Sequence, residues 1–195
     1  MSSRIPTLRS IRNDRSKLKR TLLEVQQFDF LPSRLRHAIL KVVGAKLAST
    51  SFFEAGIQFV SGRLIVGSDA YVNRGSLLDC RGGIVIGDRT LVGPRVNILT
   101  ATHPIMDSYP RAGPVEYSGV IIEADVWIGA ASTILPGAVL RRGCVVASGS
   151  IVRGELLQDR LYAGVPAIQK RRLRRRQKGS DEPKEDNSSG DLKQN

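Results

Sequence analysis

Two histidines and two cysteines are the residues of this chain best suited to proton transfer or nucleophilic attack. A histidine can accept a proton from a hydroxyl group near neutral pH. His103 stands at the root of residues 99–121, a stretch with three prolines that interrupts the pattern of the surrounding chain. On the residues alone, His103 is either a general base or a loop histidine without a chemical role. His37 is expected on the surface of a helix, away from any chemistry.

The two cysteines, Cys80 and Cys144, lack the features of a reactive or ligating pair. Neither has the partners of a nucleophilic pair, and together they suggest neither a metal motif nor a disulfide framework. Cys144 falls on a small inward position of the repeat described below, which predicts a core residue. We therefore expect no metal cofactor, and a cytoplasmic location follows as the default.

The elements that must position His103 are marked by aliphatic residues at every sixth position. The register survives residues 99–121 because Ile98 and Ile122 are four sixes apart. The main series is Ile86, Val92, Ile98, Ile122, Ile128, Ile134, Leu140, Val146 and Val152. The upstream series, offset by two at a corner around residues 80–83, is Val60, Val66, Val72, Leu78 and Ile84.

A second series of small or β-branched residues follows each aliphatic by four positions. Its members are Ala70, Ser76, Thr90, Val96, Val126, Ser132, Ala138, Cys144 and Ser150. A period of six is typical of a parallel β-helix, in which three hexapeptides form one triangular coil. A sandwich of short strands with chance spacing is disfavoured by six consecutive matches from Ile122 onward. Glycine directly after the aliphatic, at Gly67, Gly87, Gly93 and Gly129, is expected to supply the conformations of tight corners.

Residues 1–50 are predicted to form an N-terminal helical segment that caps the open end of the solenoid. Partial helix is expected over residues 1–31. A clearer helical stripe consists of Leu35, Ala38, Ile39, Val42 and Val43. Ser33 is a plausible N-cap and Gly44 a plausible stop. The β-helix domain is then assigned to residues 51–168, with residues 99–121 as a functional loop.

The net charge of +12 belongs to the two ends of the chain. Residues 1–50 carry +8, residues 51–168 are neutral and residues 169–195 carry +4. A neutral repeat domain argues against a nucleic-acid partner, although the basic ends allow weak association with an anionic membrane. Residues 169–195 are assigned to a basic and then disordered tail. No apolar run reaches the roughly 18 residues of a transmembrane helix.

Three motifs, taken together with the hexapeptide ladder, resemble the maltose/galactoside O-acetyltransferase family of left-handed β-helix acyltransferases. They are Ala101-Thr102-His103-Pro104, Asp125-Val126-Trp127-Ile128-Gly129 and Ala163-Gly164-Val165-Pro166-Ala167. The resemblance covers about residues 50–168. It implies a mainly β chain that forms a left-handed parallel β-helix, and a homotrimer with active sites in the clefts between subunits.

The resemblance also implies an acetyl-CoA-dependent O-acetyltransferase acting on a sugar or glycoconjugate, as in polysaccharide biosynthesis. His103 matches the family's general base, which deprotonates the acceptor hydroxyl for direct attack on acetyl-CoA. Asn73 matches an acceptor-binding residue and Asp79 lies near the family's acceptor-binding acid, while Glu116 supplies a polar contact from the loop. The residues implied to bind the co-substrate are Trp127, Gly129, Ala130, Ser148, Arg153 and Lys170.

The chain departs from the family pattern at two places. Ile168 stands where the family often has a basic residue after the Val-Pro pair, so Arg153, Lys170 or Arg171 is expected to meet the CoA phosphates. The N-terminal segment lacks the family's helical motif next to the acceptor, which leaves the acceptor open among polysaccharide building blocks, a free sugar and a xenobiotic such as an antibiotic.

Two other functions were weighed for the same fold. A γ-type carbonic anhydrase needs three zinc-binding histidines, and the two histidines of this chain exclude it. A catalytically inactive trimeric scaffold is disfavoured by the joint presence of His103, Asn73 and Trp127.

Overall fold

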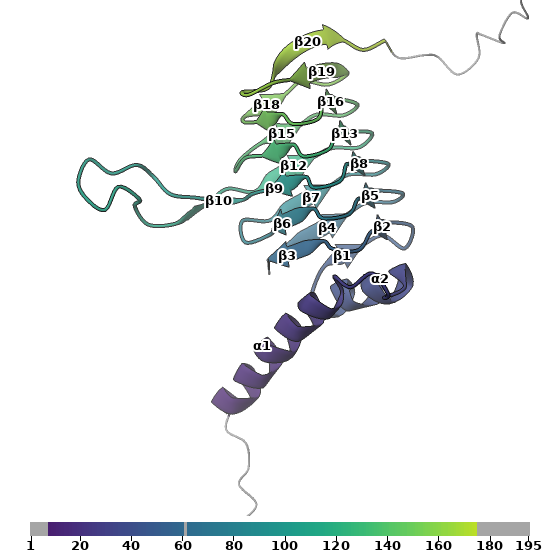
Figure 1. Cartoon of the computed structure of the whole chain (residues 1–195), viewed down its shortest axis with the longest axis vertical. Helices are drawn as coiled ribbons and strands as arrows, with labels where there is room; N and C mark the ends of the chain where they lie inside the picture. Colours follow the sequence, from purple (N-terminus) through teal and green to yellow (C-terminus); the bar gives the residue numbers. More distant parts are fainter. Residues whose placement is uncertain (1–7, 61, 175–195) are drawn as a thin grey trace, which may run out of the picture.

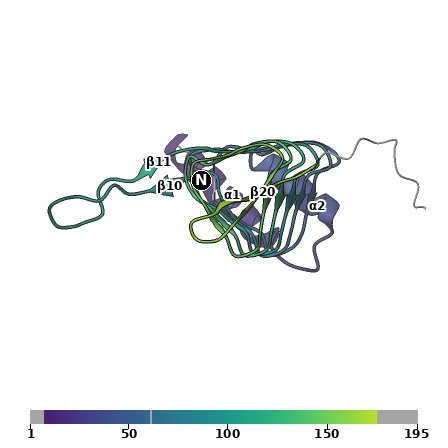
Figure 2. The same cartoon turned by 90° about the horizontal axis from the view of Figure 1, so that it is seen from above.

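The computed structural model describes residues 8–60 and 62–174. Two helices, α1 (Leu8–Val25) and α2 (Ser33–Val42), precede a left-handed parallel β-solenoid with three faces. Figure 1 shows the coils stacked above the helices, and Figure 2 shows their three-sided outline. The fold class expected from the period of six is therefore confirmed.

Each face of the solenoid is a sheet of short parallel strands, one from each coil, and one face ends in an additional antiparallel strand. Face A contains β1 (Lys46–Leu47), β4 (Leu64–Val66), β7 (Ile84–Ile86), β12 (Val120–Ile122), β15 (Val139–Leu140) and β18 (Glu155–Leu156). Face B contains β2 (Phe52–Phe53), β5 (Tyr71–Val72), β8 (Leu91–Val92), β13 (Trp127–Ile128), β16 (Val145–Val146), β19 (Arg160–Ala163) and β20 (Ile168–Arg172). Face C contains β3 (Gln58–Val60), β6 (Leu77–Asp79), β9 (Asn97–Ile98), β14 (Thr133–Ile134) and β17 (Ile151–Val152).

The core consists of the two series predicted from the sequence. Equivalent aliphatic residues pair in register across coils, as in Ile86, Ile122 and Leu140 on face A. All members of the main series and of the small series are buried. Each coil therefore covers the apolar surface of the next, and the stacked side chains exclude water along the whole axis.

Val60 is the exception in the upstream series, and its predicted inward position is wrong. Phe59 pairs with Leu78 and is buried, whereas Val60 is 36% exposed. Val66, which pairs with Ile86 of the main series, follows Phe59 after seven residues instead of six. One extra residue at that corner shifts the upstream alignment by one position, which exchanges the inward and outward side chains of a strand.

The expected reason for the glycines that follow the aliphatics is also wrong. A Cβ on Gly129 would lie 2.5 Å from the backbone nitrogen of Ser148, and one on Gly87 would lie 2.5 Å from that of Ala124. Neither glycine has a positive φ. These positions therefore require glycine because the next coil passes too close for a side chain, and not because of an unusual backbone conformation.

Helix α2 covers the N-terminal end of the solenoid, but with a different face from the one predicted. Arg36, Ile39 and Leu40 are buried, whereas Leu35 and Val42 of the predicted stripe are exposed. Arg36 takes an inward position because its guanidinium donates hydrogen bonds to four backbone carbonyls, which belong to Gln26, Phe28, Leu31 and Phe53. This one side chain joins the turn between the helices to the first coil.

The ends of α2 correct two smaller expectations. The helix begins at Ser33 with Pro32 at the N-cap, and no side chain caps it, so Ser33 is not the N-cap. Gly44, with a φ of 113°, follows the C-cap as expected for a helix stop. His37 is half-buried, with its ring edge-on to Phe53 at 6.3 Å between ring centroids, so it is not a freely exposed surface residue.

The domain boundaries stay predictions, and the structure supplies the element bounds around them. Strand β1 starts at Lys46, before the predicted boundary at residue 51, and β20 extends beyond residue 168 as an antiparallel partner of β19. The predicted disorder of residues 179–195 lies outside the described residues. Among the residues that are described, neither helix has the length and apolar character needed to cross a membrane.

Candidate active site

The loop that contains His103 leaves the solenoid between faces C and A as a hairpin. Strands β10 (Ala101–Thr102) and β11 (Glu116–Tyr117) pair antiparallel at its root. Figures 1 and 2 show the hairpin projecting outward from one corner of the solenoid. This is the one place between residues 62 and 174 where the chain departs far from the coils.

Inside this loop the imidazole of His103 has a defined orientation. Its Nδ1 lies 2.7 Å from the backbone carbonyl oxygen of Gly113, which can only accept a hydrogen bond. Nδ1 therefore carries a proton, and in the neutral form of the ring Nε2 presents a lone pair on an exposed side chain. A neutral imidazole held in this tautomer is suited to accept a proton from a hydroxyl group.

The far part of the loop exposes apolar and aromatic surface. Ile105 is 88% exposed and Tyr109 is 84% exposed. The guanidinium of Arg111 lies 4.7 Å from the ring centre of Tyr109 and donates to the carbonyls of Met106 and Asp107. The loop thus has internal order, but in the single chain most of the surface of these two side chains stays exposed.

The root of the loop is held by an ion pair between a buried carboxylate and a partly exposed guanidinium at the corner formed by residues 80–83. The Asp79 carboxylate, 6% exposed, accepts two hydrogen bonds from Arg81 at 2.8 and 3.0 Å. These bonds lower the pKa of Asp79, although burial acts in the opposite direction. The Arg81 guanidinium also lies 5.5 Å from the ring centre of Tyr117 in β11. The carboxylate predicted to bind the acceptor is therefore engaged by Arg81 and faces the loop root.

Thr100 joins the same corner to the first residue of the hairpin. Its hydroxyl donates to the carbonyl of Asp79 at 2.7 Å and accepts from the backbone N–H of Gly82 at 2.8 Å. Its own carbonyl accepts from the N–H of Ser118 at 2.9 Å. The insertion at residues 80–83 therefore positions both strands of the hairpin, and through them His103.

A second candidate region is a groove of about 460 Å³ on face B and its corner with face C. It brings together five residues that the sequence singled out, namely Asn73, Trp127, Gly129, Ala130 and Ser148. The indole of Trp127 is 56% exposed and forms one wall. The close approach of coils at Gly129 leaves no room for a side chain in the floor of the groove.

Tyr71 and Leu91 also line this groove, and the sequence analysis did not identify them. Leu91 pairs in register with Trp127, and Tyr71 pairs in register with Leu91 on the next strand of face B. The available signal was their position, since each directly precedes an inward aliphatic, as Trp127 does. Asn73 adds a polar group, because its Oδ1 accepts from the N–H of Arg74 at 2.7 Å and its amide nitrogen stays available as a donor.

The remaining predicted residues lie apart from the groove in the single chain. Glu116 is exposed in β11 at the loop root. Arg153 follows β17 at the corner between faces C and A, which is the edge from which the loop leaves. Lys170 lies on exposed strand β20, which extends face B beyond β19. Arg171 there pairs with Leu161, in the row that contains Val145 and Trp127.

The structure thus places the candidate base and the groove on different parts of one chain. His103 lies on the hairpin at the corner between faces C and A, and Trp127 lies on face B. Over the described part of the chain, no three His, Cys, Asp or Glu side chains are grouped so that they could hold a metal ion.

Comparisons with known proteins identify relatives with acyltransferase names. No protein-family model matches the chain. The chain is 32% identical to a galactoside O-acetyltransferase of Lactococcus lactis over 107 residues, 55% of this chain and 52% of the relative. It is 27% identical to the galactoside O-acetyltransferase of Escherichia coli over 132 residues, 67% of this chain and 65% of the relative. The matches therefore span between half and two thirds of these curated relatives.

Among solved structures, a hexapeptide-repeat acetyltransferase of Vibrio cholerae complexed with acetyl coenzyme A superposes with a TM-score of 0.66. It is 29% identical, and the match covers 85% of this chain and 90% of that one. These findings confirm the resemblance of the chain to the maltose/galactoside O-acetyltransferase family of left-handed β-helix acyltransferases.

Proposed function

We propose that this protein is an acetyl-CoA-dependent O-acetyltransferase that acts on a hydroxyl of a sugar or glycoconjugate. The observation that carries the proposal is the orientation of His103, whose Nδ1 donates to Gly113 and whose Nε2 is left as a base on an exposed loop. The relatives named above supply the reaction class, and the groove beside Trp127 fits the co-substrate that the Vibrio cholerae structure contains.

In the proposed reaction the acceptor hydroxyl gives its proton to Nε2 of His103 as its oxygen attacks the thioester carbonyl. A tetrahedral intermediate forms and collapses with cleavage of the carbon–sulfur bond, so the acetyl group is transferred to the acceptor oxygen. The thiolate of CoA then takes the proton from Nε2, which restores the base. Holding both reactants in one cleft makes the step effectively unimolecular.

The active protein is proposed to be a homotrimer in which the loop of one subunit reaches the groove of its neighbour. This arrangement follows from the separation of His103 and Trp127 within one chain and from the uncovered apolar side chains of Ile105 and Tyr109. Closed threefold symmetry would form three equal sites and bury the loop tips. Asn73 would orient the acceptor hydroxyl next to the groove.

Arg153 and Lys170 are proposed to bind the CoA phosphates. Lys170 stands on β20, next to Arg171 and Arg172, and all three side chains are exposed on the extension of face B. Arg153 lies on the loop edge, so it would meet the co-substrate only from the neighbouring subunit. Phosphate groups favour such clusters of cationic side chains over neutral surfaces.

The experiment that tests the proposed function is a screen of sugars with acetyl-CoA, read as release of free thiol and as mass of the acetylated product. At least one sugar should yield an O-acetylated product at a rate above that of acetyl-CoA hydrolysis. Acetyl-CoA that binds without any transfer across a broad screen of sugars, glycosides and oligosaccharides would count against an enzyme of this class.

A further inference from the structure

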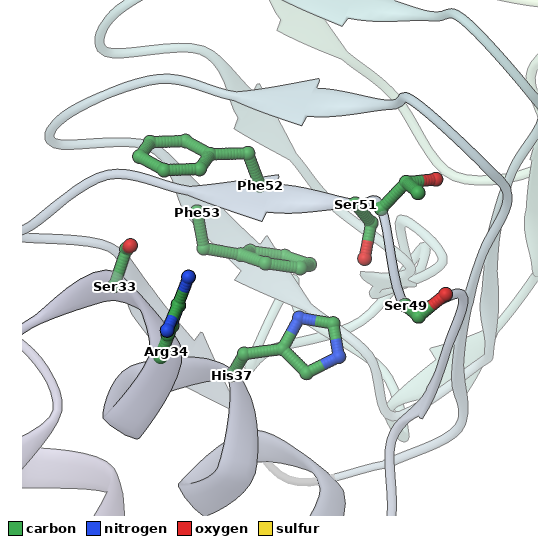
Figure 3. Close-up of a pocket in the computed structure, with 8 residues that line it drawn as sticks. Ser33, Arg34, His37, Ser49, Ser51, Phe52 and Phe53 are labelled. Atoms are coloured by element: carbon green, nitrogen blue, oxygen red, sulfur yellow. The ribbon is translucent and has the colours of Figure 1, made fainter.

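A second open pocket, of about 490 Å³, lies between α2 and the first coil. Helix α2 contributes Ser33, Arg34 and His37, and the opposite wall consists of residues 49–53. Figure 3 shows Arg34 and His37 rising from the helix toward Phe53, with Ser49 and Ser51 on the adjoining corner. None of these residues lines the groove beside Trp127 or takes part in the proposed reaction.

The polar groups of this pocket favour an anion. Arg34 is exposed and makes no ion pair with any carboxylate of the described chain. No aspartate or glutamate lines the pocket, and the first turn of α2 contains none. The hydroxyls of Ser33 and Ser49 line the same pocket as further donors, and Figure 3 shows Ser33 on the side of Arg34 and Ser49 on the side of His37. Guanidinium and hydroxyl donors without a competing carboxylate are the groups that bind phosphate and carboxylate ligands.

His37 adds a polar group that contacts the backbone of Ser51 and keeps one ring nitrogen unpaired. Its Nε2 is buried and has no hydrogen-bond partner, which is costly for a polar atom. Burial lowers the pKa of His37, and the charge of Lys41 lowers it further, so the ring is neutral near pH 7. A small rotation of the ring would offer this nitrogen to a bound ligand and relieve the unsatisfied group.

The pocket against α1 shows why a basic side chain alone does not make an anion-binding site. It has a similar volume of about 460 Å³ and is lined by Lys19, Arg20 and Glu24. There Arg20 already pairs with Glu24 at 3.3 Å, so a carboxylate of the protein competes for the cation. The pocket at Arg34 has no such competitor, and it is the one with an aromatic connection to the groove.

That connection is a pair of stacked rings on face B. Phe52 lines the Arg34 pocket, and Tyr71 lines the groove. Their ring centroids are 5.3 Å apart and their planes differ by 3°. The two rings belong to neighbouring strands β2 and β5, which lie about 4.8 Å apart in such a sheet. Two stacked aromatic rings therefore join the wall of the groove that contains Asn73 to the wall of the pocket that contains Arg34.

We propose that the Arg34 pocket binds an oxyanion, either a phosphate ester or a carboxylate, on the distal part of an extended glycan acceptor whose reacting hydroxyl lies beside Asn73. This inference rests on the proposed function for the position of the hydroxyl. It assigns the acceptor to the class of anionic oligosaccharides or phosphorylated sugars. The apolar faces of the sugar rings would pass over Phe52 and Tyr71, and the charge would end at the guanidinium.

A binding experiment tests the site without any need for turnover. Glucose 6-phosphate, glucuronate and neutral glucose are titrated by ligand-observed NMR against the wild-type protein, Arg34→Gln and the control Lys41→Gln. Lys41 lies on the same helix and is exposed, but it does not line the pocket. The two anionic sugars identify whether phosphate or carboxylate is preferred, and the control measures the effect of net charge alone.

We expect at least one anionic sugar to bind more tightly than glucose, and Arg34→Gln to weaken that binding about tenfold, as for a charge-assisted hydrogen bond. Lys41→Gln should bind as the wild type does. Equal binding of glucose and both anions, or equal losses in the two variants, would overturn the inference. Arg34 is exposed, so its substitution is not expected to unfold the helix.

Acetyl transfer to matched neutral and anionic oligosaccharides separates this inference from the proposed function. Arg34→Gln should reduce the ratio of kcat/KM for the anionic acceptor to that for the neutral acceptor about tenfold, at an unchanged KM for acetyl-CoA. An unchanged ratio would refute the role of the pocket while the acetyltransferase stands. Arg34-dependent anion binding in a protein that acetylates no acceptor would leave an anion site and refute the enzyme.

Discussion

The loop edge and the groove on face B differ in the kind of residue they contain. At the loop edge, polar groups are fixed by short contacts, with His103 held by Gly113 and Asp79 held by Arg81. In the groove, exposed Leu91 and Trp127 lie over a floor of glycine and small residues. The loop edge is therefore built to move a proton and the groove to hold an extended ligand. If this division is right, substitutions at the loop edge should change kcat and those in the groove should change KM.

The largest effect is expected for His103→Ala, which removes the proposed base. Loss of a general base typically lowers kcat by about 10²- to 10⁴-fold, and the KM for acetyl-CoA should stay nearly unchanged. Steady-state kinetics with a good acceptor provide the measurement, and circular dichroism provides the control for folding. A variant that kept more than about a third of wild-type kcat would show that the base lies elsewhere.

Mixing two defective proteins tests whether the loop and the groove of one site come from different subunits. His103→Ala and the groove-blocking variant Ala130→Trp are each expected to be nearly inactive as pure trimers. In trimers mixed at random, about a quarter of all sites would combine an intact loop with an intact groove. Coexpression should therefore restore about a quarter of wild-type activity. Mixed trimers that stay inactive would place His103 and the groove of one site on the same subunit.

Trp127→Ala should weaken the groove without disturbing the base. The loss of a large aromatic surface should raise the KM for acetyl-CoA by about 10- to 100-fold, and kcat should change much less. Because Trp127 is the one tryptophan of the chain, its fluorescence also reports on the groove directly. Calorimetry should show that CoA binds. If the fluorescence of Trp127 then does not change at saturating CoA, Trp127 does not contact the bound CoA.

Sequence reasoning predicted the coils well because each coil repeats one physical problem. An inward aliphatic residue and a small inward residue recur at fixed spacing. The register is therefore clear from many coils even where one residue departs from it. The reasoning failed where the spacing changed or where burial was polar. One extra residue misplaced Val60, and the apolar stripe of α2 gave the wrong face because the inward position holds Arg36. A pattern of hydrophobicity cannot anticipate an arginine that is buried against four backbone carbonyls.

The candidate site was predictable only in its parts. Motifs pointed to Asn73, Trp127 and Ser148, and the structure places these in one groove. The resemblance grouped His103 and Arg153 with them across clefts between subunits, and within one chain both lie at the other edge of the solenoid. The distance between two side chains on the solenoid depends on the face or corner that each residue occupies. That position follows from the repeat of three strands per coil and not from any motif. The pocket at Arg34 carries no repeat signal at all.

Arg81→Met should disturb the loop root and therefore act on kcat. Without Arg81, the buried Asp79 carboxylate has lost its partner, and the corner that positions the hairpin should loosen. We expect kcat to fall by about tenfold through misplacement of His103, at an unchanged KM for acetyl-CoA. The conservative variant Arg81→Lys should recover part of the activity because it restores a cation next to Asp79.

The stability of Arg81→Met should also depend on pH in a defined direction. In the wild type the pKa of Asp79 is lowered, so the pair stabilises the fold above the unfolded pKa of about 4. This contribution is lost as the pH falls through the lower folded pKa. The difference in Tm between the wild type and Arg81→Met should therefore be largest at neutral pH and should shrink toward pH 3 (roughly one unit below that unfolded value). A difference that does not vary with pH would show that the ion pair is not what Arg81 contributes.

The smallest effect is expected for Glu116→Gln, which tests whether the loop edge also contacts the acceptor. Glu116 is exposed in β11 and pairs with Thr102, one residue before His103. If its carboxylate accepts a hydrogen bond from the acceptor, the substitution should raise the acceptor KM by about two- to tenfold. The KM for acetyl-CoA should not change, and neither should the pH dependence of kcat, because the base is His103. Unchanged KM values for both neutral and anionic acceptors would show that Glu116 does not bind the acceptor. The loop edge would then serve proton transfer alone, and the acceptor would be bound by Asn73 and by the surface that leads to Arg34.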